Sequence, residues 1–86
     1  MPEGMDGQTR AALENLKKSL AAVGATFSDV VTADRFLTDI SQQDALNRVW
    51  GEYFGDAKPA TTTVQVVQLA TDPRCLIEIN AIAVID

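Results

Sequence analysis

Residues 41–66, SQQDALNRVWGEYFGDAKPATTTVQV, combine an amphipathic helix with the strand that follows it. Ser41, followed three residues later by Asp44, is a variant of the capping signature that opens a helix, and Gly55 is a typical C-terminal stop. The large apolar residues between them fall on one side of a helix: Leu46, Val49, Trp50, Tyr53 and Phe54. We therefore expect this helix to pack its aromatic side, Trp50 and Tyr53 included, against a sheet.

The chain beyond Pro59 is expected to form a hairpin. Residues 61–69 alternate between two faces, and a turn around Asp72 and Pro73 leads to a second strand at residues 75–85. One face of that second strand is assigned to the helices: Ile77, Ile79, Ala81, Ala83 and Ile85. The other face carries Leu76, Glu78, Asn80, Ile82 and Val84.

The N-terminal half predicts one further helix and one further strand. Residues 1–7, with two glycines and a proline, are expected to be a flexible leader. An apolar stripe follows from about Gln8, and Gly24 ends it: Leu13, Leu16, Leu20 and Val23. Residues 30–38 are rich in β-branched and aromatic residues and predict a strand, in which the neighbours Asp34 and Arg35 point to opposite faces.

These elements predict a single α+β domain over residues 1–86, a two-layer α/β sandwich with the order α-β-α-β-β. Two helices can cover only one face of a three-stranded sheet. The apolar side chains on the other face then need a cover, and a second copy of the chain is its simplest source: Leu76, Ile82 and Val84.

Composition narrows the classes of function. The net charge is −5 and the seven basic residues are scattered, so no nucleic-acid partner is expected. Histidine is absent and Cys75 is the only cysteine, which argues against a metal site, a catalytic Ser/His or Cys/His pair and an internal disulfide. No apolar run is long enough to cross a bilayer. We expect a cytoplasmic protein with no membrane partner and no cofactor.

Five segments, in order, resemble consecutive segments of the YjgF/RidA family: QTRAALENLKKSLAAVGATFSDVV (8–31), FLTD (36–39), EYFGD (52–56), KPATTTVQV (58–66) and IEINAIAV (77–84). The resemblance covers nearly the whole chain. It implies a chorismate mutase-like fold, assembly as a homotrimer or another homo-oligomer, and a site for a small carboxylate or imine ligand between subunits. It also implies an imine or enamine deaminase, a hydrolase that converts reactive 2-aminoacrylate-type intermediates to ketoacids without metal or cofactor.

Two departures from the family pattern affect this expectation. The family has strands before the QTR helix that contribute to the pocket, and only seven residues stand there in this sequence. Active deaminases of the family have an arginine after the Pro-Ala pair, where this chain has Thr61. Threonine cannot make the bidentate contact that an arginine makes with a substrate carboxylate.

The resemblance implies roles for four residues. Glu78 corresponds to the pocket glutamate that positions the hydrolytic water, Thr61 and Thr63 fall at ligand-lining positions, and Asn80 stands where a second acid is common. The alternative for Glu78 is a carboxylate satisfied by a hydrogen bond where two subunits meet, and it is favoured over the ligand role. Arg35 could replace the missing arginine, or it could pair with Asp34 of a neighbouring copy or with water.

Three functions remain open at this point. The first is an imine or enamine deaminase, and the second is a non-catalytic oligomeric module that binds a small ligand or a partner. The third is the endoribonuclease or translation inhibitor of the older family names, which the acidic composition disfavours. Cys75 is interpreted as an ordinary small apolar residue at a strand start, since only Arg74 stands beside it as a cation.

Overall fold

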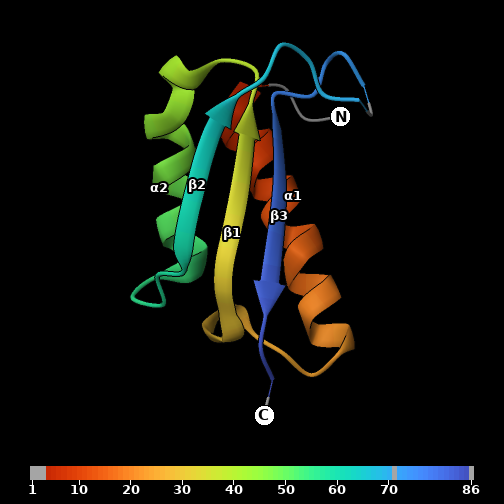
Figure 1. Ribbon diagram of the computed structural model, residues 1–86, viewed down its shortest axis with the longest axis vertical. Coiled ribbons are helices and arrows are strands. Elements are labelled where there is room, and N and C mark those ends of the chain that lie inside the picture. Colours follow the sequence, from red (N-terminus) through yellow and green to blue (C-terminus); the bar gives the residue numbers. More distant parts are fainter. Residues whose placement is uncertain (1–3, 71, 86) are drawn as a thin grey trace.

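The computed structural model describes residues 4–70 and 72–85. Its elements run in the predicted order: α1 (Gly4–Ala22), β1 (Val30–Leu37), α2 (Gln43–Phe54), β2 (Ala60–Gln65) and β3 (Ile77–Ala83), with short 3-10 turns at Phe27–Asp29 and Ile40–Gln42. Both helices lie against the same face of a three-stranded sheet (Figure 1). The predicted two-layer α+β architecture is therefore confirmed.

The predicted hairpin is wrong, because β1 lies between the other two strands. The sheet order is β2-β1-β3, with β1 parallel to β2 and antiparallel to β3. The β1–α2–β2 unit is a crossover connection through a helix, which is how two parallel strands are joined. The segment between β2 and β3 then passes along the end of the sheet, so the two last strands become its edges (Figure 1).

The core lies between the sheet and the two helices. Its fully buried side chains come from both layers: Leu13, Leu37, Leu46 and Val49. Ile79, Ala81 and Ala83 pack against them from β3, as the alternation of that strand predicted. Trp50 and Phe54 stack, and Phe27 meets Phe54 edge to face, so the aromatic side of α2 is its core side, as expected.

Helix α1 begins earlier than predicted. It starts at Gly4, and Met5 is buried as part of the hydrophobic core. The leader prediction was thus wrong for residues 4–7, and residues 1–3 lie outside the described part. Val23 was assigned to the apolar stripe, but it is 64% exposed because α1 ends at Ala22 and Val23 lies in the turn that follows.

Asp39, and not Ser41, is the capping residue in this segment, and it caps the 3-10 turn that precedes α2. The Asp39 carboxylate accepts hydrogen bonds from the Ser41 amide (3.0 Å) and the Ser41 hydroxyl (2.6 Å). These bonds favour the ionised form and hold the pKa of Asp39 below its ordinary value. A 3-10 turn separates this cap from the first residue of α2, so the sequence signature at Ser41 was offset by two residues.

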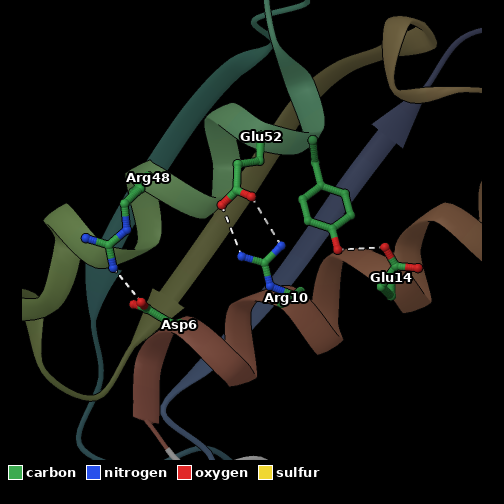
Figure 2. Close-up of polar contacts among 6 residues, drawn as sticks. Asp6, Arg10, Glu14, Arg48 and Glu52 are labelled. Atoms are coloured by element: carbon green, nitrogen blue, oxygen red, sulfur yellow. Dashed lines mark hydrogen bonds and ion pairs between the residues drawn. The ribbon is translucent and has the colours of Figure 1, made fainter.

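Polar contacts join the exposed sides of the two helices (Figure 2): Arg48 with Asp6, Arg10 with Glu52, and Tyr53 with Glu14. Arg10 donates to both carboxylate oxygens of Glu52, at 3.4 and 3.1 Å. The Tyr53 hydroxyl donates to Glu14 at 2.6 Å, and this bond raises the pKa of Tyr53. Exposed pairs of this kind add little stability, so they mainly set how the helices align.

The loop between β2 and β3 is pinned to α1 by Gln8. Its side-chain nitrogen donates to the Arg74 carbonyl (3.0 Å), and its oxygen accepts from the Leu76 amide (2.6 Å). Leu69 is buried in this loop, although it was predicted to end a strand. Leu76 was assigned to the open face but packs against the core, because it precedes β3 and is not held by the strand's alternation.

The face of the sheet away from the helices carries exposed apolar side chains. Ile82 is 61% exposed, and Val64 on β2 is 40% exposed. Val84, just past β3, is also exposed. This agrees with the open face expected from the sequence. Within the described part of the chain, no helix is both long and apolar enough to span a membrane.

Candidate functional site

A buried arginine occupies the helix side of the central strand. Arg35 is only 5% exposed, and its Nε donates to Thr63 Oγ1 (2.9 Å) while one terminal nitrogen donates to Asn47 Oδ1 (2.8 Å). Its guanidinium also lies over the Trp50 ring, 5.0 Å from the centroid. Alternation sends the Arg35 side chain inward and leaves Asp34 exposed, so the two neighbours point to opposite faces of the sheet, as predicted. Pairing of Arg35 with Asp34 of a neighbouring copy or with water stays a prediction.

The charge of Arg35 has no carboxylate partner among the described residues. Both of its hydrogen-bond acceptors are neutral oxygens. Burial lowers the pKa of Arg35 from its ordinary value, but an arginine still remains protonated at neutral pH. A fixed positive charge therefore lies in the interior without a counter-ion among residues 4–70 and 72–85.

A cavity of about 530 Å³ opens beside this guanidinium, between the C-terminal part of α2 and the edge strand β2. Its lining residues are Arg35, Asn47, Trp50, Gly51, Phe54, Gly55, Lys58, Pro59 and Thr61. The size is in the usual range for a small-molecule site. The lining contains two cations, Arg35 and Lys58, and no Asp or Glu among the described residues. Its apolar wall comes from rings, chiefly Trp50 and Phe54.

Glu78 lies on the opposite edge of the sheet. It is half-buried on β3, in register with Phe36 of β1. It also borders a second, more open cavity of about 380 Å³ between α1 and β3, whose other lining residues are Ala12, Asn15, Leu16, Ser19, Ile77 and Ile79. Asn80 is exposed two residues further on, opposite Asp34.

The four residues singled out from the sequence do not meet within one chain. Thr61 and Thr63 lie on β2, Glu78 and Asn80 lie on β3, and β1 separates the two strands. Thr61 borders the cavity next to Arg35, and Thr63 accepts the Arg35 hydrogen bond. A ligand that touches both Thr61 and Glu78 would need the two edges to be brought together by a neighbouring copy.

Sequence reasoning missed three residues of the cationic cavity. Trp50 was expected to pack on the sheet, and Asn47 and Lys58 were given no role in a site, yet all three border one cavity with Arg35. The available signal was the inward-facing arginine on a strand otherwise bordered by apolar positions, since such a charge needs partners. Among the described residues, no group of three or more Cys, Asp or Glu side chains is arranged to hold a metal ion.

Comparisons with known proteins agree with this fold. The family model described as Endoribonuclease L-PSP matches residues 1–85. A RutC family protein of Pyrococcus horikoshii is 45% identical over 76 residues, which cover 88% of this chain and 59% of that protein. A 2-iminobutanoate/2-iminopropanoate deaminase of Capra hircus is 38% identical over 84 residues, or 98% of this chain and 60% of that protein.

A solved structure shows the same architecture. Rv2704 from Mycobacterium tuberculosis, a member of the YjgF/YER057c/UK114 family, superposes with a TM-score of 0.94 at 35% identity, covering 99% of this chain and 71% of that one. This confirms the predicted chorismate mutase-like fold. The chain spans about three-fifths of the length of the curated relatives that it matches. The sequence motifs, the sheet order and these matches agree, and the chain belongs to the YjgF/RidA family, the family of the Endoribonuclease L-PSP model.

Proposed function

We propose that this protein hydrolyses small imines or enamines that carry a carboxylate, in a cleft completed by a second copy of the chain. The observation that carries the proposal is Glu78, a half-buried carboxylate on an edge strand beside a cavity, in a chain similar to proteins named for imine and aminoacrylate deamination. The exposed apolar face of the sheet supports self-association, with a homotrimer as the expected form.

The chemistry requires a positioned water and a proton relay. Glu78 accepts a proton from water as the water oxygen bonds to the carbon of the C=N group, and the nitrogen takes up a proton. The carbon–nitrogen bond of the resulting carbinolamine then breaks, ammonia leaves, and a ketone remains. An enamine first becomes the imine by gaining a proton on carbon and losing one from nitrogen. One carboxylate can serve each proton transfer in turn, so neither metal nor cofactor is needed.

The test is a coupled assay in which a lyase releases 2-aminoacrylate and the rate of pyruvate and ammonia formation is compared with the spontaneous rate. We expect the protein to raise this rate. Glu78→Gln should lower the increase roughly 100-fold or more, because the amide cannot accept the proton. Asp44→Asn, a matched change at an exposed site on α2, should leave it unchanged. A folded protein that gives no rate above background would end the proposal.

The alternative is a non-catalytic module that binds a small ligand or a protein partner. Thr61 favours it, since that position carries no charge to hold a substrate carboxylate, and so does the distance in the sheet between β2 and β3. Thr61→Arg separates the two candidates. If the pocket is otherwise competent, the variant should be more active than the wild type, whereas a non-catalytic module should stay inactive with either residue.

A ribonuclease is the least supported function. The family model is described as Endoribonuclease L-PSP, but this chain has a net charge of −5. Three of its seven basic residues are already paired with carboxylates: Arg10, Arg48 and Arg74. RNA binding depends on cations that displace counterions from phosphates. RNA binding by this chain at physiological salt would reverse the ranking.

A further inference from the structure

We propose that the cavity beside Arg35 binds the carboxylate group of a small ligand, with Arg35 as the fixed anchor and Lys58 as a second cation at its rim. The inference deepens the proposed function by naming the group that recognises the substrate, and in that sense rests on it. Binding itself, however, requires no catalysis and can be tested without it.

The first argument is the state of the Arg35 charge. A buried ion without an opposite charge is costly, and proteins normally pair it. Arg35 has only the neutral acceptors Thr63 and Asn47 and the face of Trp50 around it. Its second terminal nitrogen, Nη2, has no hydrogen-bond partner among the described residues, although the side chain borders an open cavity. An anion in that cavity would complete the site.

The second argument is that the guanidinium is held in place before any ligand arrives. Thr63 and Asn47 fix two of its nitrogens from β2 and α2, and the Trp50 ring supports its plane. A preorganised donor loses little conformational entropy on binding, which increases affinity. The same two bonds also explain why Arg35 can be tolerated in the core when the cavity is empty.

The third argument is the composition of the lining. Cations, an amide and a hydroxyl are combined with apolar rings, and the described lining includes no acid, in a chain whose net charge is −5. Part of the lining, Phe54 and Gly55, lies at the C-terminal end of α2, where the helix dipole is negative and disfavours a doubly charged anion more than a singly charged one. Phosphate sites typically use the opposite, N-terminal end. A singly charged, planar carboxylate with a short apolar tail fits this lining better than a phosphate.

The test uses propanoate, which carries a carboxylate but no group that the protein could hydrolyse. Trp50 is the only tryptophan in the sequence and borders the cavity, so its fluorescence reports binding. At constant ionic strength and pH 7, propanoate should give a saturable change with an affinity at least about tenfold higher than that of propanamide, its neutral counterpart. Equal affinities for the two compounds would overturn the proposal.

Variants separate a specific site from general charge effects. Lys58→Gln should weaken propanoate binding several-fold, while Lys18→Gln, which removes the same charge from an exposed site on α1, should not. Arg35→Gln should abolish the saturable fluorescence change on addition of propanoate. If that variant does not fold, Lys58→Gln decides the question, because Lys58 is exposed. Equal effects at Lys58 and Lys18, or tighter binding of inorganic phosphate than of propanoate, would refute the assignment.

The failure of this inference can be told apart from failure of the proposed function. Propanoate binding without deaminase activity would support the anion site and remove the catalytic role of Glu78. The opposite result is deaminase activity that depends on Glu78 but not on Arg35 or Lys58, together with no propanoate binding. It would support the proposed function and refute the assignment of Arg35 as the carboxylate anchor.

Discussion

The guanidinium of Arg35 lies 5.0 Å from the centroid of the Trp50 ring, so a buried cation on the central strand rests on the core face of α2. Hydrogen bonds to Thr63 and Asn47 extend this contact to β2 and to a second position on α2. One side chain thus joins three elements. The parallel pairing of β1 with β2, in which Arg35 is in register with Thr63, makes this possible.

Replacing Arg35 with lysine should destabilise the fold. Lysine keeps the charge but loses the fork that serves Thr63 and Asn47 together, and it leaves a more strongly hydrated ion in the core. We expect a loss of about 1–3 kcal/mol in the free energy of unfolding, measured by urea denaturation. Arg48→Lys, at an exposed ion pair, is the control and should change stability by less than about 0.5 kcal/mol. Equal effects would show that Arg35 has no special structural role.

Gln8 should be required for the position of the loop before β3. In Gln8→Glu the acceptor for the Leu76 amide remains, but the donor to the Arg74 carbonyl is lost and a carboxylate faces that carbonyl. We expect a loss of about 1–3 kcal/mol and faster hydrogen exchange at the Leu76 amide. Gln65→Glu is the control. It keeps the oxygen that accepts a hydrogen bond from the Ile40 amide, so it should change the free energy of unfolding very little. Unchanged exchange at Leu76 would contradict this account.

The exposed apolar face of the sheet should mediate self-association. Ile82→Lys places a charge on this face, at the edge strand β3, and we expect the oligomer to dissociate or weaken strongly, because burying an unpaired charge in an interface is costly. Val67→Lys adds the same charge at a fully exposed position outside the strands and should leave assembly unchanged. Light scattering measures the mass of each variant. A wild-type protein that is monomeric at all concentrations would exclude this interface.

The contribution of Asp72 to the stability of the fold should depend on pH only in the acidic range. The side-chain hydrogen bond from Arg74 lowers the pKa of Asp72 from 3.8 to about 2. Because the pKa of Asp72 is lower in the folded state than in the unfolded state, ionised Asp72 stabilises the fold. This stabilisation is fully present above pH 3.8 and is lost as the pH falls towards about 2. The difference in thermal midpoint between the wild type and Asp72→Asn should therefore be constant near neutral pH and vanish near pH 2. A difference that changes around pH 6 would point to another group.

The elements of this fold could be predicted from local patterns in the chain. The apolar spacing of Leu46, Val49 and Phe54 and the alternation of residues 77–83 each describe one face of one element, and both were confirmed. The ends of the helices were predicted less accurately than their apolar faces. Helix α1 begins early enough to include the buried Met5, and the side-chain cap at Asp39 belongs to a 3-10 turn before α2 and not to the helix itself.

Only part of the candidate site could be predicted from local patterns in the sequence. The motif IEINAIAV identified Glu78, and the Pro-Ala pair identified Thr61, through the family resemblance. The cationic cavity was not predicted, since Arg35, Asn47 and Lys58 are far apart along the chain and share no motif. These three residues line one cavity only because α2 packs on β1.

The sequence by itself determined the order of the helices and strands and most of their faces, because hydrophobic periodicity and turn residues act over a few neighbouring positions. Its motifs, by their resemblance, identified the family. The tertiary structure decided which strands pair. Placing β1 in the centre separates Glu78 from Thr61 and puts Arg35 beside Thr63. That choice depends on how all the apolar faces are buried together, which is a property of the whole chain and is encoded in no single segment.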